Sequence, residues 1–244
     1  MSARRGKSRG ARHADWLRLI DVSGPFIGVG VLAETFPQGL DTDEPRAAAL
    51  LREGYAAWEV NRRLRHPDRA VHRAWTMLVL ENFLEYHDGL LAEGPAIPET
   101  MKATLPEHRI TLRPDFAVGR SGERPTLLVS VFASGTGLER PKDERGFHAS
   151  PAERMRLLLR GAGVGSGLLT NGDQWMLVHQ PADRTATFAT WESDVLIEES
   201  EARRAFRSLL GARRLLGVAP ADTLDGLFER SRDDEREVTD QLGT

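Results

Sequence analysis

The sequence contains no cysteine, only two tyrosines, and only three lysines, at Lys7, Lys102 and Lys142. Without cysteine there are no disulfides and no thiolate metal sites, which is typical of a cytoplasmic protein. No apolar run reaches the length of about 18 residues that a membrane helix requires, and the basic N-terminus leads into no secretory signal. The net charge is -3, with 40% apolar and 28% charged residues. We therefore expect a cytoplasmic globular protein that has no membrane partner.

Helical patterns dominate the first 90 residues. A short helix is expected to end near Ile20, before a break at residues 23–25. A longer helix is predicted from residues 43 to 64, because proline stands in its first turn and apolar residues recur at helical spacing. Another helix follows Pro67-Asp68 and runs through "RAVHRAWTMLVLENFLEY". The glycines and prolines of residues 89–98 predict a loop.

The middle of the chain changes to the period of strands. Residues 109–119 and 125–132 are predicted strands, separated by a turn. A helix is expected to begin at Ser150-Pro151, because serine at the cap, proline at the first position and Glu153 form a capping box. Strands are then predicted in "GLLT", "QWMLVH" and "TATFATW", with a tight Asn171-Gly172 hairpin between the first two.

This order predicts an α/β fold in which a mixed sheet carries helices on its faces. We assign residues 68–191 to the sheet core. Residues 1–67 are assigned to a basic tail and a helical wrapper, and residues 192–244 to a C-terminal helical extension. The last helical pattern continues to Val238 and Leu242 without a stop signal, so we expect the chain to be a fragment of a longer protein.

The stretch "LRPDFAVGRSGERPTLLVSVF" contains half of a metal site. Nucleases of the PD-(D/E)xK class place an aspartate on one strand and an acid-x-lysine triplet on the next. Two carboxylates hold a divalent ion there, and the lysine activates water. Here Asp115 provides the first carboxylate, but Ser130 and Phe132 stand where the acid and the lysine are required. We therefore expect a degenerate nuclease centre.

Several stretches together resemble the N-terminal nuclease-like region of restriction-modification proteins: "LRPDFAV", "LLVSVF", "SPAERMRLLLR" and "GLLTNGDQWMLV". Type I restriction subunits and the type IIG and IIL fused enzymes carry a similar helix followed by a "TNG…W" hairpin. The opening "DWLRLIDVSGPF" is similar to adenine-specific DNA methyltransferases of phage-defence operons, in particular the DISARM type. The resemblance implies a restriction-endonuclease-like PD-(D/E)xK core. It also implies DNA, defence-system subunits or a downstream methyltransferase domain as partners.

The same resemblance suggests site residues. Asp115 matches the first metal ligand of the family, and Glu81 or Glu85 on the preceding helix, or the more distant Glu59, is a candidate second acid. Because some nucleases of this fold move the lysine or acid to a neighbouring element, Lys142, Glu139 and Arg154 are candidates for a displaced group. If the centre is active, it requires Mg²⁺. The alternative for Asp115 is a hydrogen bond to a nearby backbone amide.

Arginines are the candidate DNA ligands. Arg154, Arg156 and Arg160 lie on the predicted helix that begins at Ser150, and Arg4 and Arg5 lie in the basic tail. A solvated helix face explains the first three equally well. Trp175 either stacks on a base or fills the core beneath the hairpin, and we favour the core.

Three functions remain open. The preferred one is the N-terminal domain of a restriction-modification or phage-defence methyltransferase that binds DNA or a partner subunit through a degenerate nuclease fold. The second is an active Mg²⁺-dependent endonuclease with Asp115 and a displaced acid and lysine. The third is a protein-interaction scaffold without DNA contact, which the acidic net charge favours.

Overall fold

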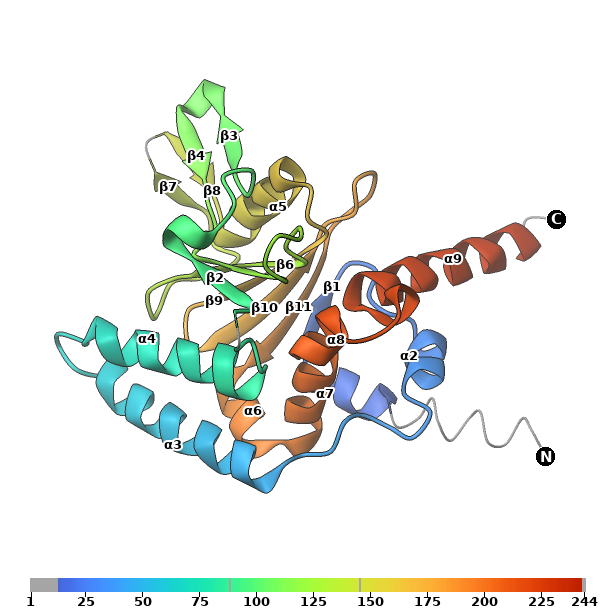
Figure 1. Ribbon diagram of the computed structural model, residues 1–244, viewed down its shortest axis with the longest axis horizontal. Coiled ribbons are helices and arrows are strands. Elements are labelled where there is room, and N and C mark those ends of the chain that lie inside the picture. The colour runs from blue at the N-terminus through green and yellow to red at the C-terminus, as the bar shows by residue number, and fades with distance from the viewer. Residues whose placement is uncertain (1–12, 88, 145, 243–244) are drawn as a thin grey trace.

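A seven-stranded mixed sheet forms the centre of the protein in the computed structural model, which describes residues 13–87, 89–144 and 146–242 (Figure 1). Strands β6 and β9 pair in parallel, and the other neighbours pair antiparallel. The predicted mixed sheet with helices on its faces is therefore confirmed. The order across the sheet is β1 (Asp21–Ser23), β11 (Thr187–Glu192), β10 (Gln174–His179), β9 (Ser166–Thr170), β6 (Leu127–Val131), β5 (Phe116–Val118) and β2 (Leu91–Glu93).

Helices cover both faces of the sheet, as Figure 1 shows, and α5 (Pro151–Ala162) lies on the face opposite α3, α4, α6 and α7. No helix of the described residues is long and apolar enough to cross a membrane. Besides α5, the helices are α2 (Val29–Thr35), α3 (Pro45–Arg62), α4 (Arg69–Met77), α6 (Ser193–Glu198), α7 (Ser200–Leu210), α8 (Ala212–Leu216) and α9 (Leu224–Leu242), with a π-helical turn η1 (Leu78–Phe83) and the 3-10 turns Gly94–Ala96, Pro106–His108 and Pro220–Asp222.

Alternate residues of the strands enter two separate cores. On β6, Leu127 and Val129 pack under the large helical layer, whereas Leu128 packs under α5. The same alternation continues at the end of the strand, where Val131 contacts the first core and Phe132 contacts the second. A strand with both faces covered reads as a continuous apolar run, which explains the sequence "LLVSVF".

Helix α5 begins where the sequence predicts, at the capping box of Ser150 and Glu153. The Ser150 side chain accepts a hydrogen bond from the Glu153 backbone N–H at 3.1 Å, and the Glu153 carboxylate accepts one from the Ser150 N–H at 2.9 Å. Gly163 ends the helix in the left-handed conformation, with φ of +65°. This crossover connects the parallel strands β6 and β9 and fixes their order.

Two short edge strands differ from the predictions. Strand β1 forms where a break was expected, and pairs Asp21–Ser23 with the edge of β11. Strand β2 forms within the predicted loop 89–98 and pairs Leu91 with Val118 of β5. Both segments have three residues, so they are too short to carry a periodic signal, and only their pairing partners determine their conformation.

The predicted strand 109–119 is also wrong as a single element. It is interrupted at Arg113-Pro114, because proline has no N–H to donate to a strand ladder. The first part, β4 (Ile110–Leu112), pairs with β3 (Ala103–Leu105) in a separate hairpin over α5, and the second part is β5 of the main sheet. A further hairpin, β7 (Lys142–Glu144) with β8 (Phe147–Ala149), was not predicted.

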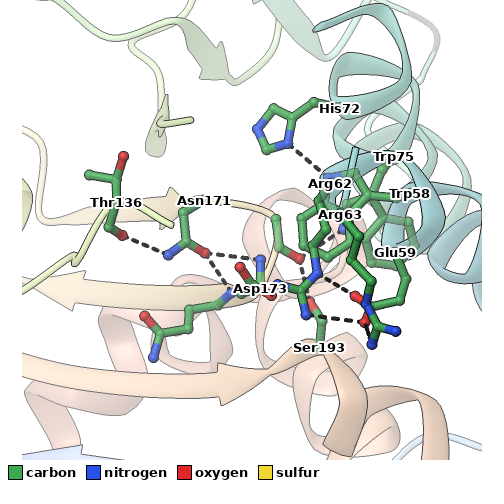
Figure 2. Close-up of polar contacts among 12 residues, drawn as sticks. Trp58, Glu59, Arg62, Arg63, His72, Trp75, Thr136, Asn171, Asp173 and Ser193 are labelled. Atoms are coloured by element: carbon green, nitrogen blue, oxygen red, sulfur yellow. Dashed lines mark hydrogen bonds and ion pairs between the residues drawn. The ribbon is translucent and has the colours of Figure 1, made fainter. Parts of the chain in front are cut away.

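The hairpin between β9 and β10 connects the sheet to the helical layer (Figure 2). The Asn171 side chain accepts hydrogen bonds from the N–H groups of Asp173 and Gln174 and donates one to the Thr136 carbonyl at 2.8 Å. The Gly172 carbonyl accepts hydrogen bonds from Trp75 Nε1 at 3.0 Å and from Ser193 Oγ at 2.8 Å. The predicted hairpin is confirmed, and its glycine lies against α3 and α4.

We predict that Gly172→Ala lowers the free energy of unfolding by about 2–4 kcal/mol, from a left-handed backbone and an overpacked core together. Gly172 has φ of +87°, and an added Cβ would lie 2.4 Å from Trp58 Cζ2. The change is measured by urea unfolding. Gly122→Ala is the matched control, because Gly122 has φ of +79° with no atom within 4 Å of the added Cβ. Equal losses for the two variants would contradict the packing argument.

Candidate functional site

A pocket of about 760 Å³ opens beside the end of β6, between α4 and the segment that contains β2 and the following 3-10 turn. We call it the Asp115 pocket. Its floor includes Pro114, Asp115 and Val131, so the strand-end aspartate predicted from the sequence does lie in a concave site. Its charged lining residues are Arg69, Arg73, Glu93, Glu99, Arg113 and Asp115.

Asp115 lies directly before β5, and its carboxylate accepts a hydrogen bond from the Val131 backbone N–H at 2.7 Å. The β5–β6 register pairs Phe116 with Val129, so Asp115 comes opposite Ser130 one step beyond it. A nuclease of the predicted class would carry its second acid at this position. The backbone hydrogen bond is the alternative that the sequence analysis named for Asp115.

The walls of the pocket raise the pKa of Asp115 above its ordinary value. Although the side chain reaches solvent through the mouth, the surrounding protein removes much of the water from the carboxylate, and this desolvation is the largest cause. The Val131 N–H acts in the opposite direction, and the nearby charge of Glu93 raises the pKa further. No cation forms an ion pair with this carboxylate among the described residues.

The other two acids of the pocket are already paired with arginines. Arg73 binds Glu93 through two hydrogen bonds of 2.8 and 2.7 Å, and Arg113 binds Glu99 through two of 3.1 and 3.0 Å. These side chains are at least half exposed, so solvent screens both pairs and they contribute little to folding. Their main effect is to give both acids a positively charged partner and to balance the charge of the pocket.

His72 forms part of the wall and has both ring nitrogens occupied. Trp58 Nε1 donates to Nδ1 at 2.9 Å (Figure 2). On the other side of the ring, Nε2 lies 2.9 Å from the Phe132 carbonyl. Together the two contacts require a neutral ring that carries its proton on Nε2. Desolvation lowers the pKa of His72 and favours the same neutral form. The ring therefore joins α3 and α4 to the end of β6 and is not available as a general base.

The acids predicted on the preceding helix do not line this pocket. Glu81 is exposed on the π-helical turn, and Glu85 binds Arg207 at 2.6 Å beside a different cavity. Glu59 is held by Arg62 and Arg63 on α3. The structure therefore brings Asp115 together with Glu93, which lies in the predicted loop 89–98 and was not a candidate.

The predicted basic residues are spread over several surfaces. Lys142 and Arg154 line a second pocket on the other side of the β6 end, so they do not reach Asp115. Arg156 donates to the Gln180 side chain at 3.0 Å, and Arg160 is exposed near the end of α5. Glu139 is exposed and lines neither pocket. Arg4 and Arg5 lie outside the described residues.

The residues around Asp115 do not fit a magnesium site of the expected kind. No group of three or more histidine, aspartate or glutamate side chains is arranged for a metal ion among the described residues. Glu93 is bound by Arg73, Ser130 provides no carboxylate, and Phe132 packs in the core under α5. A Mg²⁺ ion takes its ligands as oxygens in near-octahedral geometry, and one unpaired carboxylate is not enough to hold it.

A basic segment at the α3–α4 turn is the feature that the sequence analysis missed. Residues 62–73 contain five arginines and one aspartate. Arg65 and Arg69 are exposed and form no ion pair within the described part of the chain, and Arg69 and Arg73 line the Asp115 pocket. The run "RRLRHPDRAVHR" is visible in the sequence, but it was read only as the boundary between two helices.

A serine, a histidine and an aspartate also meet at the opposite end of the sheet. Ser166 Oγ donates to Asp225 at 2.6 Å and lies 3.1 Å from His179 Nδ1, and Phe228 stacks on the histidine ring at 4.0 Å. Ser166 is fully buried, so its hydroxyl is no accessible nucleophile. These contacts join α9 to strands β9 and β10 of the sheet.

Comparison with protein-family models, curated proteins and solved structures finds no match to this chain in any of the three. The resemblance to nuclease-like regions therefore remains a hypothesis. The features of this chain that bear on function are the Asp115 pocket and the basic turn beside it.

We predict that Asp115→Asn changes stability in a pH-dependent way. A raised folded-state pKa means that the folded protein disfavours the charged carboxylate, so stability decreases as the pH rises through the folded-state pKa. The asparagine variant should therefore gain stability relative to the unmutated protein at pH 7, and the gain should disappear as the pH falls below the ordinary aspartate range. Urea unfolding at several pH values measures this. The prediction is wrong if the free energy of unfolding of the variant, relative to that of wild type, is lower at pH 7 than at pH 3.

Proposed function

We propose that this chain is a DNA-binding, non-cleaving domain from the N-terminal region of a restriction-modification or phage-defence methyltransferase. The observation that carries the proposal is the basic α3–α4 turn beside the Asp115 pocket, in which the second half of a nuclease site is missing. The turn provides positive charge for phosphates, and the pocket lacks the ligands for hydrolysis.

The order of elements supports the nuclease-like part of the proposal. A long helix, α4 with its π-helical turn, precedes β2, β5 and β6, and the crossover α5 leads to β9. Asp115 lies directly before β5, and the positions expected for the acid and the lysine are the penultimate residue of β6, Ser130, and the residue that follows β6, Phe132. This order supports our interpretation of the sheet as the scaffold of such a site, with side chains that cannot complete it.

Electrostatics supports DNA as the ligand. Arg65 and Arg69 extend into solvent at one end of the helical hairpin, and two more arginines of the pocket lie close by. A net charge of -3 weakens general attraction to DNA, so a local cluster must provide the contact. Arginine binds phosphate in a bidentate geometry that lysine does not reproduce, and almost all basic residues of this chain are arginine.

We predict that Arg65→Gln with Arg69→Gln weakens DNA binding about tenfold at physiological salt. The slope of log K against log salt should fall by about 2, since each lost phosphate contact releases about 0.9 fewer counterions. Fluorescence anisotropy with a labelled duplex, repeated over a range of sodium chloride concentrations, measures both values.

Arg46→Gln with Arg52→Gln is the matched control. These arginines lie on the first half of α3, are exposed, and form no ion pair among the described residues. The control removes the same charge from a different part of the helical hairpin, away from the α3–α4 turn, and its salt slope should stay close to that of wild type. Equal weakening by both variants would show a general charge effect, and no salt-dependent binding by the unmutated protein would favour the interaction scaffold instead.

We predict that the protein leaves supercoiled plasmid intact with or without Mg²⁺ or Mn²⁺. The reason is the ligand count at Asp115, where Glu93 is bound by Arg73 and Ser130 replaces the second acid. The experiment is plasmid incubation followed by agarose electrophoresis, beside an Asp115→Ala variant. Metal-dependent nicking that disappears in the variant would establish an endonuclease and overturn the non-cleaving assignment.

A further inference from the structure

A second pocket, of about 750 Å³, lies on the other side of the β6 end from Asp115. We call it the Lys142 pocket. It is lined by the loop from Phe132 to Gly137 and by Arg140, Lys142 and Arg154, and it shares Val131 with the Asp115 pocket. The two pockets are therefore neighbours separated by the end of a single strand.

The two pockets differ in charge. Three acids and three arginines line the Asp115 pocket, whereas the described residues that line the Lys142 pocket include three basic residues and no acid. Arg140 and Lys142 are exposed and form no ion pair or side-chain hydrogen bond within the described residues. Arg154 donates to the Phe147 carbonyl at 3.2 Å, which holds its guanidinium at the pocket wall.

Backbone donors lie beside these cations. The N–H groups of Ser134, Gly135 and Gly137 donate no hydrogen bond to other described parts of the chain. Gly135 has φ of +80°, and Ser134 and Thr136 add two hydroxyl groups to the lining. Unpaired N–H groups around a left-handed residue form a concave set of donors that favours anions.

The loop is held in place from behind. Asn171 Nδ2 donates to the Thr136 carbonyl at 2.8 Å, and the Thr136 N–H donates to the Ala133 carbonyl at 3.1 Å. Figure 2 shows Asn171 reaching from its hairpin to Thr136. A loop fixed in this way orients its donors before a ligand arrives, which lowers the entropy lost on binding.

We propose that the Lys142 pocket binds a phosphate group. A phosphate presents several strong acceptor oxygens and more than one negative charge, which matches two cations without acidic partners and a set of N–H and O–H donors. The phosphate belongs either to a nucleic acid backbone or to a free phosphate ester. Only the first source depends on the proposed function, because the pocket itself does not require DNA at the α3–α4 turn.

The test uses the purified full chain and an Arg140→Gln, Lys142→Gln variant. Isothermal titration calorimetry with inorganic phosphate, at constant ionic strength, measures binding to the pocket. We expect one site on the unmutated protein and at least tenfold weaker binding to the variant. Both substitutions replace exposed side chains, and an unchanged melting temperature confirms that the variant folds.

The Arg46→Gln, Arg52→Gln protein serves again as the control, since it loses the same net charge away from the pocket. It should bind inorganic phosphate like the unmutated protein. Absence of binding to the unmutated protein, or equal affinity of the Arg140→Gln, Lys142→Gln variant, overturns the proposal.

Duplex DNA then identifies the source of the phosphate. If the backbone of DNA enters the pocket, the slope of log K against log salt is smaller by about 2 for the Arg140→Gln, Lys142→Gln variant. This is the change expected when two phosphate contacts are lost. If phosphate binding is lost while the salt slope is unchanged, the pocket holds a free phosphate ester. A wrong proposed function gives a different result. In that case the Arg65→Gln, Arg69→Gln variant has the same affinity for DNA as the unmutated protein, and the phosphate titration is unaffected.

Discussion

The carbonyl oxygen of Gly172 receives two hydrogen bonds from parts of the chain that lie far apart in sequence. Trp75 Nε1 reaches it from α4, and Ser193 Oγ reaches it from the start of α6, with Trp175 Nε1 donating to the same serine at 3.1 Å. The tip of one hairpin thus joins the sheet to the helical layer. Because Trp75 lies on the same helix as Arg69 and Arg73, this junction also sets the position of one wall of the Asp115 pocket.

The end of β6 divides two sites with different electrostatic character. On one side, Glu93 and Glu99 are paired with arginines and Asp115 accepts a hydrogen bond from the backbone, so each acid has a partner and the charges balance. On the other side, cations and backbone donors line a recess that has no acid among its described lining residues. A metal centre requires several carboxylates at one point, which the charge-balanced Asp115 pocket does not provide, whereas the Lys142 pocket is suited to a group that carries its own negative charge.

Local signals in the sequence predicted the parts of the fold that local interactions determine. The capping box at Ser150, the Asn171-Gly172 hairpin, the long helices of the first half and the core position of Trp175 were readable, because each depends on residues close in sequence or on apolar periodicity. Asp115 was found from its proline neighbour and the apolar segment around it. Its pairing with the Val131 N–H was one of the two alternatives that the sequence left open.

The remaining features depend on partners that are distant in sequence. Glu93 enters the pocket because a three-residue strand pairs with β5, and it binds Arg73, which is 20 positions earlier. The predicted strand that includes Pro114 is divided between two sheets. Glu85 accepts a hydrogen bond from Arg207, which is 122 positions later in the chain. No periodicity in a single segment encodes such contacts. The arginines of residues 62–73 were readable as a charge cluster, but their place beside a pocket was not.

The contact of Gly172 with the rings of Trp58 and His72 also has an evolutionary consequence. A Cβ at residue 172 would lie 2.4 Å from Trp58 and 2.9 Å from His72 Cε1, and the two rings are themselves hydrogen-bonded. A side chain at any one of these positions is acceptable only if the other two leave room for it. Among homologous sequences, we therefore expect residues 58, 72 and 172 to change together, as a covarying group that spans more than a hundred positions of the chain.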